Sequence, residues 1–195
     1  MTDRQREKAL IPFYDGKLEY YSPASAQEIY KILWVAGAPI TGRMLDVGCG
    51  DGRAYGALKG RFKYVGVDYS EQRVLLARQC FEGDDNARFI ARDLYDELPH
   101  LDSESFELVW CCELLEHLEN PEEIWDLMKV LCKPGGKVVC TCPVNMPHEA
   151  HLHVWKDAAE LQQAFPDIKE LRYVSCKTPG GHWRRHFVFT WWPSD

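Results

Sequence analysis

The chain has 195 residues, 46% of them hydrophobic, and a formal net charge of −7. This length is enough for one well-buried core and short for two, so we expect a single domain over residues 1–195. The negative charge disfavours broad attraction to nucleic acid or to anionic membranes. The longest apolar run, residues 32–40, is shorter than the ~20 residues that span a bilayer. Residues 1–8 are charged, unlike a secretory signal, and we therefore expect a cytoplasmic protein with no membrane contact.

Eight cysteines are spread over segments with the pattern of core strands and helices. No Cys-x-x-Cys pair is present, and the spacing of Cys111 to Cys112 and of Cys140 to Cys142 is too short for a usual zinc site. Reduced, mostly buried thiols are therefore expected rather than a disulfide scaffold or structural zinc.

The first 42 residues lie before the alternating strands and helices of the main fold and differ from them in pattern. Residues 25–36 repeat apolar side chains at helical spacing, and Pro39 follows them. Four aromatic residues precede this predicted helix, where they suit a lid over a ligand as well as packing in the core: Phe13, Tyr14, Tyr20 and Tyr21. We therefore treat residues 1–42 as an N-terminal helix and lid segment, and residues 43–195 as the core.

From Arg43 onward, short aliphatic runs alternate with helical stretches, which is typical of a parallel sheet flanked by helices. The sequence predicts five such strands, at residues 44–47, 64–67, 88–91, 106–111 and 137–142. Two more apolar runs, at residues 173–176 and 186–192, lie on either side of a turn-forming Pro-Gly-Gly pattern at residues 179–181. They predict a hairpin of two strands at the end of the sheet.

Two of the intervening helices have clear start signals. Ser70 is placed to cap the first of them, because its hydroxyl can accept a hydrogen bond from a first-turn amide. Asn120, Pro121 and two glutamates predict the start of the second. Pro134 and the two glycines after it are expected to separate this helix from the next strand.

The most informative segment is the loop after the first predicted strand. It places glycine at three alternate positions in the sequence Leu45-Asp46-Val47-Gly48-Cys49-Gly50-Asp51-Gly52. Backbone without side chains allows a nucleotide to approach closely. Asp68, which ends the next strand, is placed to accept hydrogen bonds from both hydroxyls of a ribose. The loop and Asp68 therefore predict a nucleoside-binding site.

A dinucleotide site is the obvious competitor. Its Gly-x-Gly-x-x-Gly spacing would need a third glycine at the position of Arg53. Asp46 and Asp51 also bring negative charge to the loop, which suits the cationic sulfonium and amino group of S-adenosylmethionine better than a pyrophosphate.

The loop and four later segments together resemble the class I S-adenosylmethionine-dependent methyltransferases. The segments at residues 65–70, 91–94 and 106–117 resemble the family's second, third and fourth strands, and residues 131–136 resemble the turn before its fifth. The resemblance implies an α/β fold: a Rossmann-like three-layer sandwich whose seven-stranded, mostly parallel sheet has an antiparallel last strand. It points to a small single-domain enzyme similar to the methyltransferases of ubiquinone biosynthesis.

The resemblance also implies roles for individual residues. Asp68 would bind the ribose, and Asp93 the adenine amino group, with Leu94 packed at the base. Asp46 and the glycines would surround the methionine part. The cofactor-binding residues implied in this way are Asp46, Gly48, Cys49, Gly50, Gly52, Asp68, Tyr69, Asp93, Leu94 and Cys111.

Two polar clusters offer groups that assist proton loss from an acceptor. Glu113, Glu116 and His117 follow the fourth strand and would share one face of a short helix, either solvated or catalytic. Three histidines follow the fifth strand, in a loop that is either simply polar or part of the site: His148, His151 and His153. We take Glu113, His117 and His151 as the catalytic candidates.

The Glu113-x-x-Glu116-His117 pattern with a later histidine resembles metal-assisted O-methyltransferases, including those of ubiquinone biosynthesis and of small-RNA 3′ ends. Here His151 or His153 would complete a mixed set of carboxylates and imidazoles that suits magnesium, manganese or iron. The same pattern is common in related methyltransferases that use no metal, so a divalent ion is not favoured.

A basic and aromatic group surrounds the turn before the last predicted strand. Its members are Lys177, His182, Trp183, Arg184 and Arg185. The group suits an anionic or aromatic acceptor, but a half-solvated sheet edge has the same pattern.

Together these features predict an enzyme that transfers a methyl group from S-adenosylmethionine to oxygen or nitrogen of a small molecule and leaves S-adenosylhomocysteine. Holding the acceptor in line with an activated methyl group supplies much of the rate enhancement, so no protein nucleophile is required. The alternatives are a metal-assisted O-methyltransferase, including one that methylates RNA 2′-oxygens, and a noncatalytic subunit that binds S-adenosylmethionine. Nucleic acid is not the expected partner.

Overall fold

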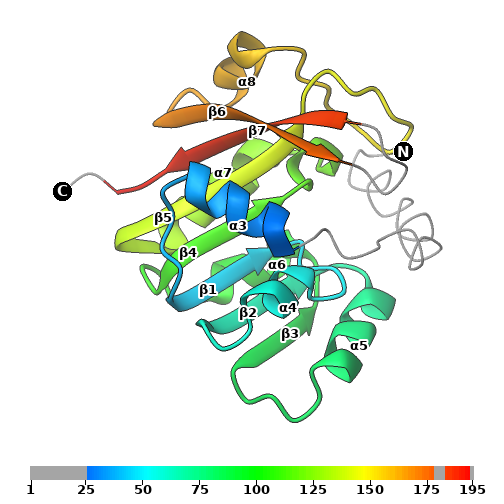
Figure 1. Cartoon of the computed structure of the whole chain (residues 1–195), viewed down its shortest axis with the longest axis vertical. Helices are drawn as coiled ribbons and strands as arrows, with labels where there is room; N and C mark the ends of the chain where they lie inside the picture. Colours follow the sequence, from blue (N-terminus) through cyan, green and yellow to red (C-terminus); the bar gives the residue numbers. More distant parts are fainter. Residues whose placement is uncertain (1–25, 178–182, 194–195) are drawn as a thin grey trace.

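The computed structural model describes residues 26–177 and 183–193, which form a seven-stranded sheet between two layers of helices (Figure 1). The strand order is β3-β2-β1-β4-β5-β7-β6. Neighbouring strands from β3 to β5 are parallel, whereas β7 is antiparallel to β5 and β6. This arrangement confirms the predicted Rossmann-like fold. The strands are β1 (Gly42–Val47), β2 (Phe62–Asp68), β3 (Ala87–Ala91), β4 (Phe106–Cys112), β5 (Cys132–Pro143), β6 (Glu170–Lys177) and β7 (Trp183–Trp191).

The central strands are buried on both faces, as their continuous apolar runs predict. In β1, Met44, Leu45 and Val47 have no exposed surface. Because side chains alternate across a strand, Leu45 and Val47 join one apolar cluster while Met44 joins the other. The sheet therefore separates two cores.

Helices α3, α4 and α5 cover one face of the sheet, and α6, α7 and α8 cover the other (Figure 1). The hydroxyl of Ser70 accepts a hydrogen bond from the amide of Arg73 at 3.2 Å, which confirms the predicted cap of α5. Asn120 precedes α7, but its side chain makes no capping hydrogen bond. The helices are α3 (Ala26–Val35), α4 (Arg53–Leu58), α5 (Glu71–Cys80), α6 (Leu94–Glu97), α7 (Pro121–Leu131) and α8 (Ala158–Ala164), with short 3₁₀ turns η1 (Leu98–His100) and η2 (Leu115–His117).

Strand β5 is longer than the sequence predicts. We expected it to begin after Pro134 and its two glycines, but the chain passes from α7 directly into β5 at Cys132. Phe106 pairs with Cys132, and the register then shifts before Leu108 pairs with Lys137. The proline and glycines therefore form an irregularity inside the strand instead of a separate turn.

The predicted terminal hairpin is present as the antiparallel pair β6 and β7. Its turn at residues 179–181 and His182 lie outside the described residues, as do the four N-terminal aromatic residues of the predicted lid. Helix α3 lies within the predicted span of residues 25–36, and its apolar stripe is buried against the sheet through Ile29, Ile32 and Leu33.

The seven cysteines with described side chains are all free thiols, and most of them are buried. Within the described ranges, no helix combines the length and apolar character that crossing a membrane requires.

Candidate active site

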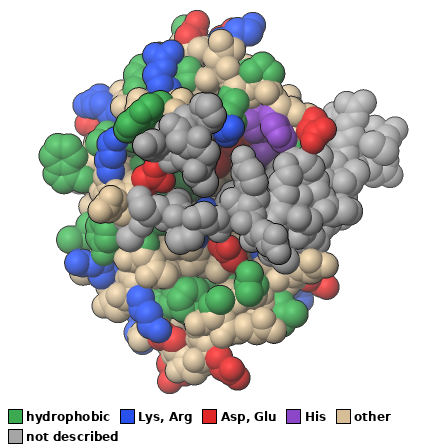
Figure 2. All heavy atoms as spheres, turned by 45° about the vertical axis from the view of Figure 1, so that its right-hand side comes forward, with side chains coloured by type: hydrophobic (Ala, Val, Ile, Leu, Met, Phe, Trp, Pro, Cys, Tyr) green, Lys and Arg blue, Asp and Glu red, His purple; other side chains and the backbone are tan. Residues whose placement is uncertain are grey.

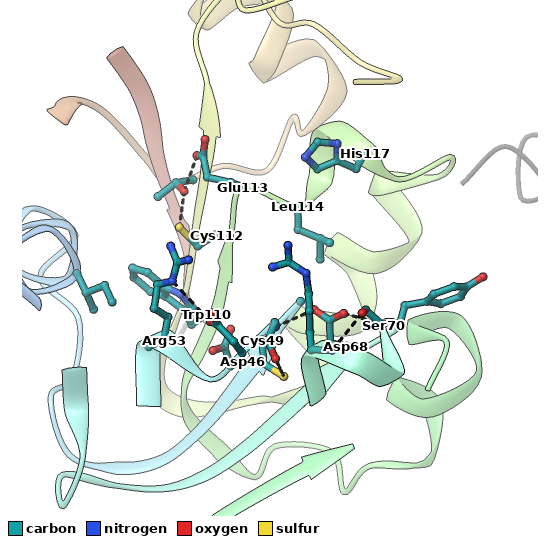
Figure 3. A pocket seen from close by; sticks show the side chains of 18 of the residues that line it. Asp46, Cys49, Arg53, Asp68, Ser70, Trp110, Cys112, Glu113, Leu114 and His117 are labelled. Atoms are coloured by element: carbon teal, nitrogen blue, oxygen red, sulfur yellow. Dashed lines mark hydrogen bonds and ion pairs between the residues drawn. The ribbon is translucent and has the colours of Figure 1, made fainter. Parts of the chain in front are cut away.

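A pocket of about 330 Å³ opens at the carboxyl ends of β1, β2 and β4, where ligands bind in sheets of this type. Helices α3, α4, α5 and α6, the turn η2 and strands β5 and β7 contribute further lining residues (Figure 3). Figure 2 shows histidine side chains gathered on one face of the molecule beside an acidic side chain. The pocket is lined by Glu28, Ile29, Ile32, Asp46, Gly48, Cys49, Gly50, Asp51, Arg53, Ala54, Asp68, Tyr69, Ser70, Arg73, Leu94, Trp110, Cys112, Glu113, Leu114, His117, Leu118, Thr141 and His186.

The glycine loop needs glycine at each of its three alternate positions. Gly48, Gly50 and Gly52 have φ angles of 81°, 53° and 79°, a region that side chains disfavour. A Cβ at Gly48 would also lie 3.0 Å from the side chain of Leu114. The Gly48 amide donates to the carbonyl of Val67 at 2.8 Å, which holds the loop against β2.

Asp68 connects the loop to the end of β2. One carboxylate oxygen accepts a hydrogen bond from the Gly50 amide at 2.8 Å, and the other accepts from the Ser70 amide at 2.9 Å. Burial raises the pKa of Asp68, although backbone hydrogen bonds from Ser70, Gly50 and Tyr69 oppose this shift. A carboxylate has about four lone pairs, so Asp68 retains acceptor capacity for a ligand hydroxyl.

Asp46 lies at the floor of the pocket, hydrogen-bonded to a partner that the sequence did not reveal. The hydroxyl of Tyr64 donates to its carboxylate at 2.6 Å. Burial raises the pKa of Asp46 to about 7, with the Tyr64 hydrogen bond opposing the shift and the charges of Asp68 and Asp51 adding to it. Asp46 therefore changes its charge near neutral pH.

Two arginines make the charge of the loop less negative than the sequence suggested. Arg53 lies beside Asp51, with its Nε 3.6 Å from a carboxylate oxygen. Arg73 of α5 is buried, and its charge acts to lower the pKa of Asp68. Acidic and basic groups thus share the nucleoside end of the pocket.

The predicted short helix begins only at Leu115, as the 3₁₀ turn η2, and Glu113 lies before it in a bend of the chain. Glu113 has a φ of 53°, which costs a non-glycine residue of the order of 1–3 kcal/mol. Its carboxylate accepts a hydrogen bond from the Thr141 hydroxyl at 2.9 Å and lies 2.9 Å from Nδ1 of His186. Burial lowers the pKa of His186, but Glu113 outweighs burial and raises it above its ordinary value.

Glu116 and His117 follow in η2, and the prediction of a solvated polar face is wrong for Glu116, which is 1% exposed. Glu116, His117 and His151 offer ligand atoms within 4.8 Å of one another. Burial lowers the pKa of His117 to about 4, against the raising effect of its hydrogen bond to the Ala150 carbonyl. His153 lies outside this group, with its ring stacked on Trp155.

Most of the predicted cofactor residues line the pocket, including Tyr69 and Leu94. Gly52 lies just beyond the lining as the residue before α4, and Asp93 caps α6 through a 3.1 Å hydrogen bond from the Tyr95 amide. Cys111 is fully buried in the core on the other face of the sheet.

Several lining residues were missed by the sequence analysis. Trp110 and Cys112 line the pocket from either side of Cys111, because alternate residues of β4 share a face. Thr141 and His186 gave no local signal, since only the pairing of β5 with β4 and β7 brings them to the pocket. Of the basic group near the last turn, Trp183, Arg184 and Arg185 are exposed and do not line the pocket.

Residues 45–140 match the methyltransferase domain family. The ubiquinone biosynthesis O-methyltransferase of Coxiella burnetii is 34% identical over 112 residues, which cover 56% of this chain and 47% of that protein. These matches indicate a methyltransferase domain over residues 45–140. The Pseudomonas aeruginosa protein of the same name is 31% identical over 129 residues, covering 64% of this chain and 53% of its own length. The chain thus spans about half the length of the curated relatives it matches.

The fold of the chain also matches that of solved structures. The crystal structure of magnesium protoporphyrin IX methyltransferase from Synechocystis PCC 6803 superposes with a TM-score of 0.67 at 16% sequence identity, over 97% of each chain. A similarity at this level of identity supports the fold alone.

Proposed function

We propose that this protein transfers the methyl group of S-adenosylmethionine to oxygen or nitrogen of a small molecule. The observation that carries the proposal is the hydrogen-bonded contact between the glycine loop and Asp68. The loop is held open by three left-handed glycines, and the carboxylate of Asp68 is fixed by two amides while it retains lone pairs for a ribose.

The pocket has two ends with different chemistry. Asp46, Cys49 and Asp68 lie at one end, and Glu113 and His117 lie at the other (Figure 3). A donor bound over β1 and β2 would direct its methyl group toward the second end, where the acceptor would be held in line for displacement. The volume of about 330 Å³ favours a small acceptor.

The relatives support this activity. The two curated relatives are named as O-methyltransferases, and the Synechocystis enzyme was crystallised with bound S-adenosylmethionine. The free, mostly buried thiols support a reducing compartment such as the cytoplasm.

Calorimetric titration with S-adenosylhomocysteine, and with NAD for comparison, tests whether the protein binds the proposed donor. The catalytic and the noncatalytic alternatives both require this binding, and the test needs no known acceptor. We expect S-adenosylhomocysteine to bind and NAD not to bind. Absence of S-adenosylhomocysteine binding to folded protein would refute the proposal. Binding without turnover in a broad acceptor screen would instead favour the noncatalytic subunit.

A metal-assisted form of the reaction is a second candidate, because the arrangement of Glu116, His117 and His151 favours it. The second carboxylate oxygen of Glu116 is buried without a hydrogen-bond partner among the described residues. His117 and His151 each direct Nδ1 at a backbone carbonyl, at 2.8 and 2.7 Å, as metal-ligating histidines commonly do. These residues fit a divalent ion, which would lower the pKa of an acceptor hydroxyl.

Metal removal separates the two forms. Metal-dependent methyl transfer should be lost after treatment with a chelator and recover with added manganese or iron, and Glu116→Gln should weaken that recovery. Full activity of metal-depleted protein would exclude the metal-assisted form and leave the methyltransferase proposal intact.

A further inference from the structure

Three side chains from adjacent strands form a hydrogen-bonded group at the acceptor end of the pocket. Glu113 follows β4, Thr141 lies on β5 and His186 lies on β7, and all three line the pocket. The Thr141 hydroxyl donates to one carboxylate oxygen of Glu113, and Nδ1 of His186 lies 2.9 Å from the other. Each carboxylate oxygen of Glu113 therefore has a side-chain partner, and the single hydroxyl proton of Thr141 is shared with Sγ of Cys112 at 3.1 Å.

The backbone of Glu113 indicates that this placement is specifically maintained. Its φ of 53° is uncommon outside glycine, and strained residues of this kind cluster at functional sites. The Glu113 amide donates to the Thr141 carbonyl at 3.0 Å, which holds the turn against β5. This backbone places the carboxylate beside His186, with the side chain of Glu113 33% exposed.

The chemistry of the pair fixes the tautomer of His186. An ionised carboxylate only accepts hydrogen bonds, so Nδ1 of His186 carries the proton that faces Glu113. In the neutral ring Nε2 is then the nitrogen with a lone pair. A carboxylate that orients an imidazole and stabilises its protonated form is the arrangement of a general base.

We propose that His186, oriented by Glu113, is the general base that accepts the proton of a hydroxyl acceptor. The inference rests on the proposed methyltransferase function and narrows its acceptor to a hydroxyl compound. The acceptor oxygen forms a bond to the methyl carbon while the carbon–sulfur bond breaks and its electron pair remains on sulfur. The hydroxyl proton moves to Nε2 of His186, and the carboxylate of Glu113 stabilises the resulting imidazolium.

The surroundings of His186 suit this role better than those of His117. Burial holds His117 neutral with a weakly basic ring. Glu113, which follows β4, and Glu28 of α3 both raise the pKa of His186, whereas Arg184 of β7 lowers it. The two acidic groups favour proton uptake by His186, and the sheet order places it away from the Asp68 end.

Steady-state kinetics of His186→Gln, Glu113→Gln and the double variant test the proposal, with His100→Gln as a matched control. His100 is exposed in η1 and does not line the pocket. The acceptors are catechol and 4-hydroxybenzoate, with thiophenol as an acceptor that ionises without help. His186→Gln should lower kcat for a hydroxyl acceptor by about 100-fold or more with little change in KM.

Three further readouts distinguish a base from a structural residue. The loss for thiophenol should stay below about tenfold, since its proton needs no acceptor on the protein. The double variant should be no slower than His186→Gln, because the pair acts as a unit. The nitrogen chemical shifts of His186 in the wild-type protein should report a proton on Nδ1.

The outcomes separate this inference from the proposed function. Calorimetry with S-adenosylhomocysteine should give unchanged affinity for every variant, and loss of binding by the wild-type protein would refute the proposed function itself. Unchanged kcat in His186→Gln, equal losses for hydroxyl and thiol acceptors, additive effects in the double variant, a proton on Nε2, or wild-type turnover of no hydroxyl acceptor would each overturn the role of His186.

Discussion

The two ends of the pocket are built in different ways. The nucleoside end comes from one short stretch of chain, in which the loop after β1 and the end of β2 are joined by hydrogen bonds of Gly50 and Gly48. The acceptor end combines Glu113, Thr141 and His186 from three strands that meet only in the folded sheet. On the proposed function, donor recognition is therefore a local property of the sequence, whereas acceptor chemistry depends on the topology of the sheet.

Replacing His117 with Ala should give the largest difference between an effect on turnover and an effect on S-adenosylhomocysteine affinity. Because His117 lies with Glu113 at the acceptor end, where it would position the acceptor, we expect turnover to fall by about 100-fold while affinity for S-adenosylhomocysteine is nearly unchanged. Initial rates and calorimetry measure the two effects, with His100→Ala as the control. An equal loss of S-adenosylhomocysteine affinity would place His117 at the donor end.

Asp68→Ala should have the opposite pattern. Losing a charged acceptor for the ribose hydroxyls should weaken S-adenosylhomocysteine binding by about 1–3 kcal/mol. The exposed Asp102→Ala removes the same charge without touching the pocket and should bind normally. Unchanged affinity in folded Asp68→Ala protein would remove Asp68 from the donor site.

Gly48→Ala tests whether the loop acts through its backbone. A left-handed non-glycine residue costs about 1–2 kcal/mol, and the new Cβ would also press on Leu114. Gly83 has a similar φ of 76° but open space around it, so Gly83→Ala isolates the cost of the dihedral angle. Denaturant unfolding should show destabilisation of both variants, and calorimetry should show weaker S-adenosylhomocysteine binding only for Gly48→Ala. Equal binding by both variants would contradict close approach of the ligand to the loop.

The smallest expected effect is the pH dependence of donor affinity. Asp46 has a pKa raised to about 7, so it loses its charge as the pH falls through 7. Attraction to the cationic donor is present above this value, and affinity for S-adenosylmethionine should fall up to about tenfold between pH 8 and pH 6.

Two variants sharpen this test. Asp46→Asn should bind S-adenosylmethionine weakly at both pH values, with a flat profile measured by calorimetry. Tyr64→Phe removes a hydrogen bond that lowers the pKa of Asp46, so the fall in affinity should begin at a higher pH. A wild-type profile that is flat from pH 6 to pH 8 would contradict a role for the charge of Asp46.

The contrast between the two ends also explains what the sequence could predict. The strand positions, the glycine loop and Asp68 follow from local patterns of apolar residues and glycine. The seven-stranded sheet with its antiparallel last strand is implied by the family resemblance, and the structure confirms it. Cys111 and Cys112 are neighbours on β4 that face opposite cores, so a shift of one residue decides which of them reaches the pocket.

His186 could not be found in this way. Its strand was predicted, but its partner Glu113 was assigned to a helix with Glu116 and His117, and no local pattern indicates that β7 pairs with β5. The histidine clusters near residues 117 and 151 drew attention because they are close in sequence. The Glu113–His186 pair depends on long-range strand pairing.

Strand β7 follows every other strand in chain order, yet it lies inside the sheet between β5 and β6. During synthesis, the segments that carry the glycine loop and Asp68 leave the ribosome well before His186 does. On the proposed function, a nascent chain could assemble its donor site first, and bound S-adenosylmethionine would stabilise that partly folded state by mass action. Insertion of β7 would then be the step at which a binding domain becomes a catalyst.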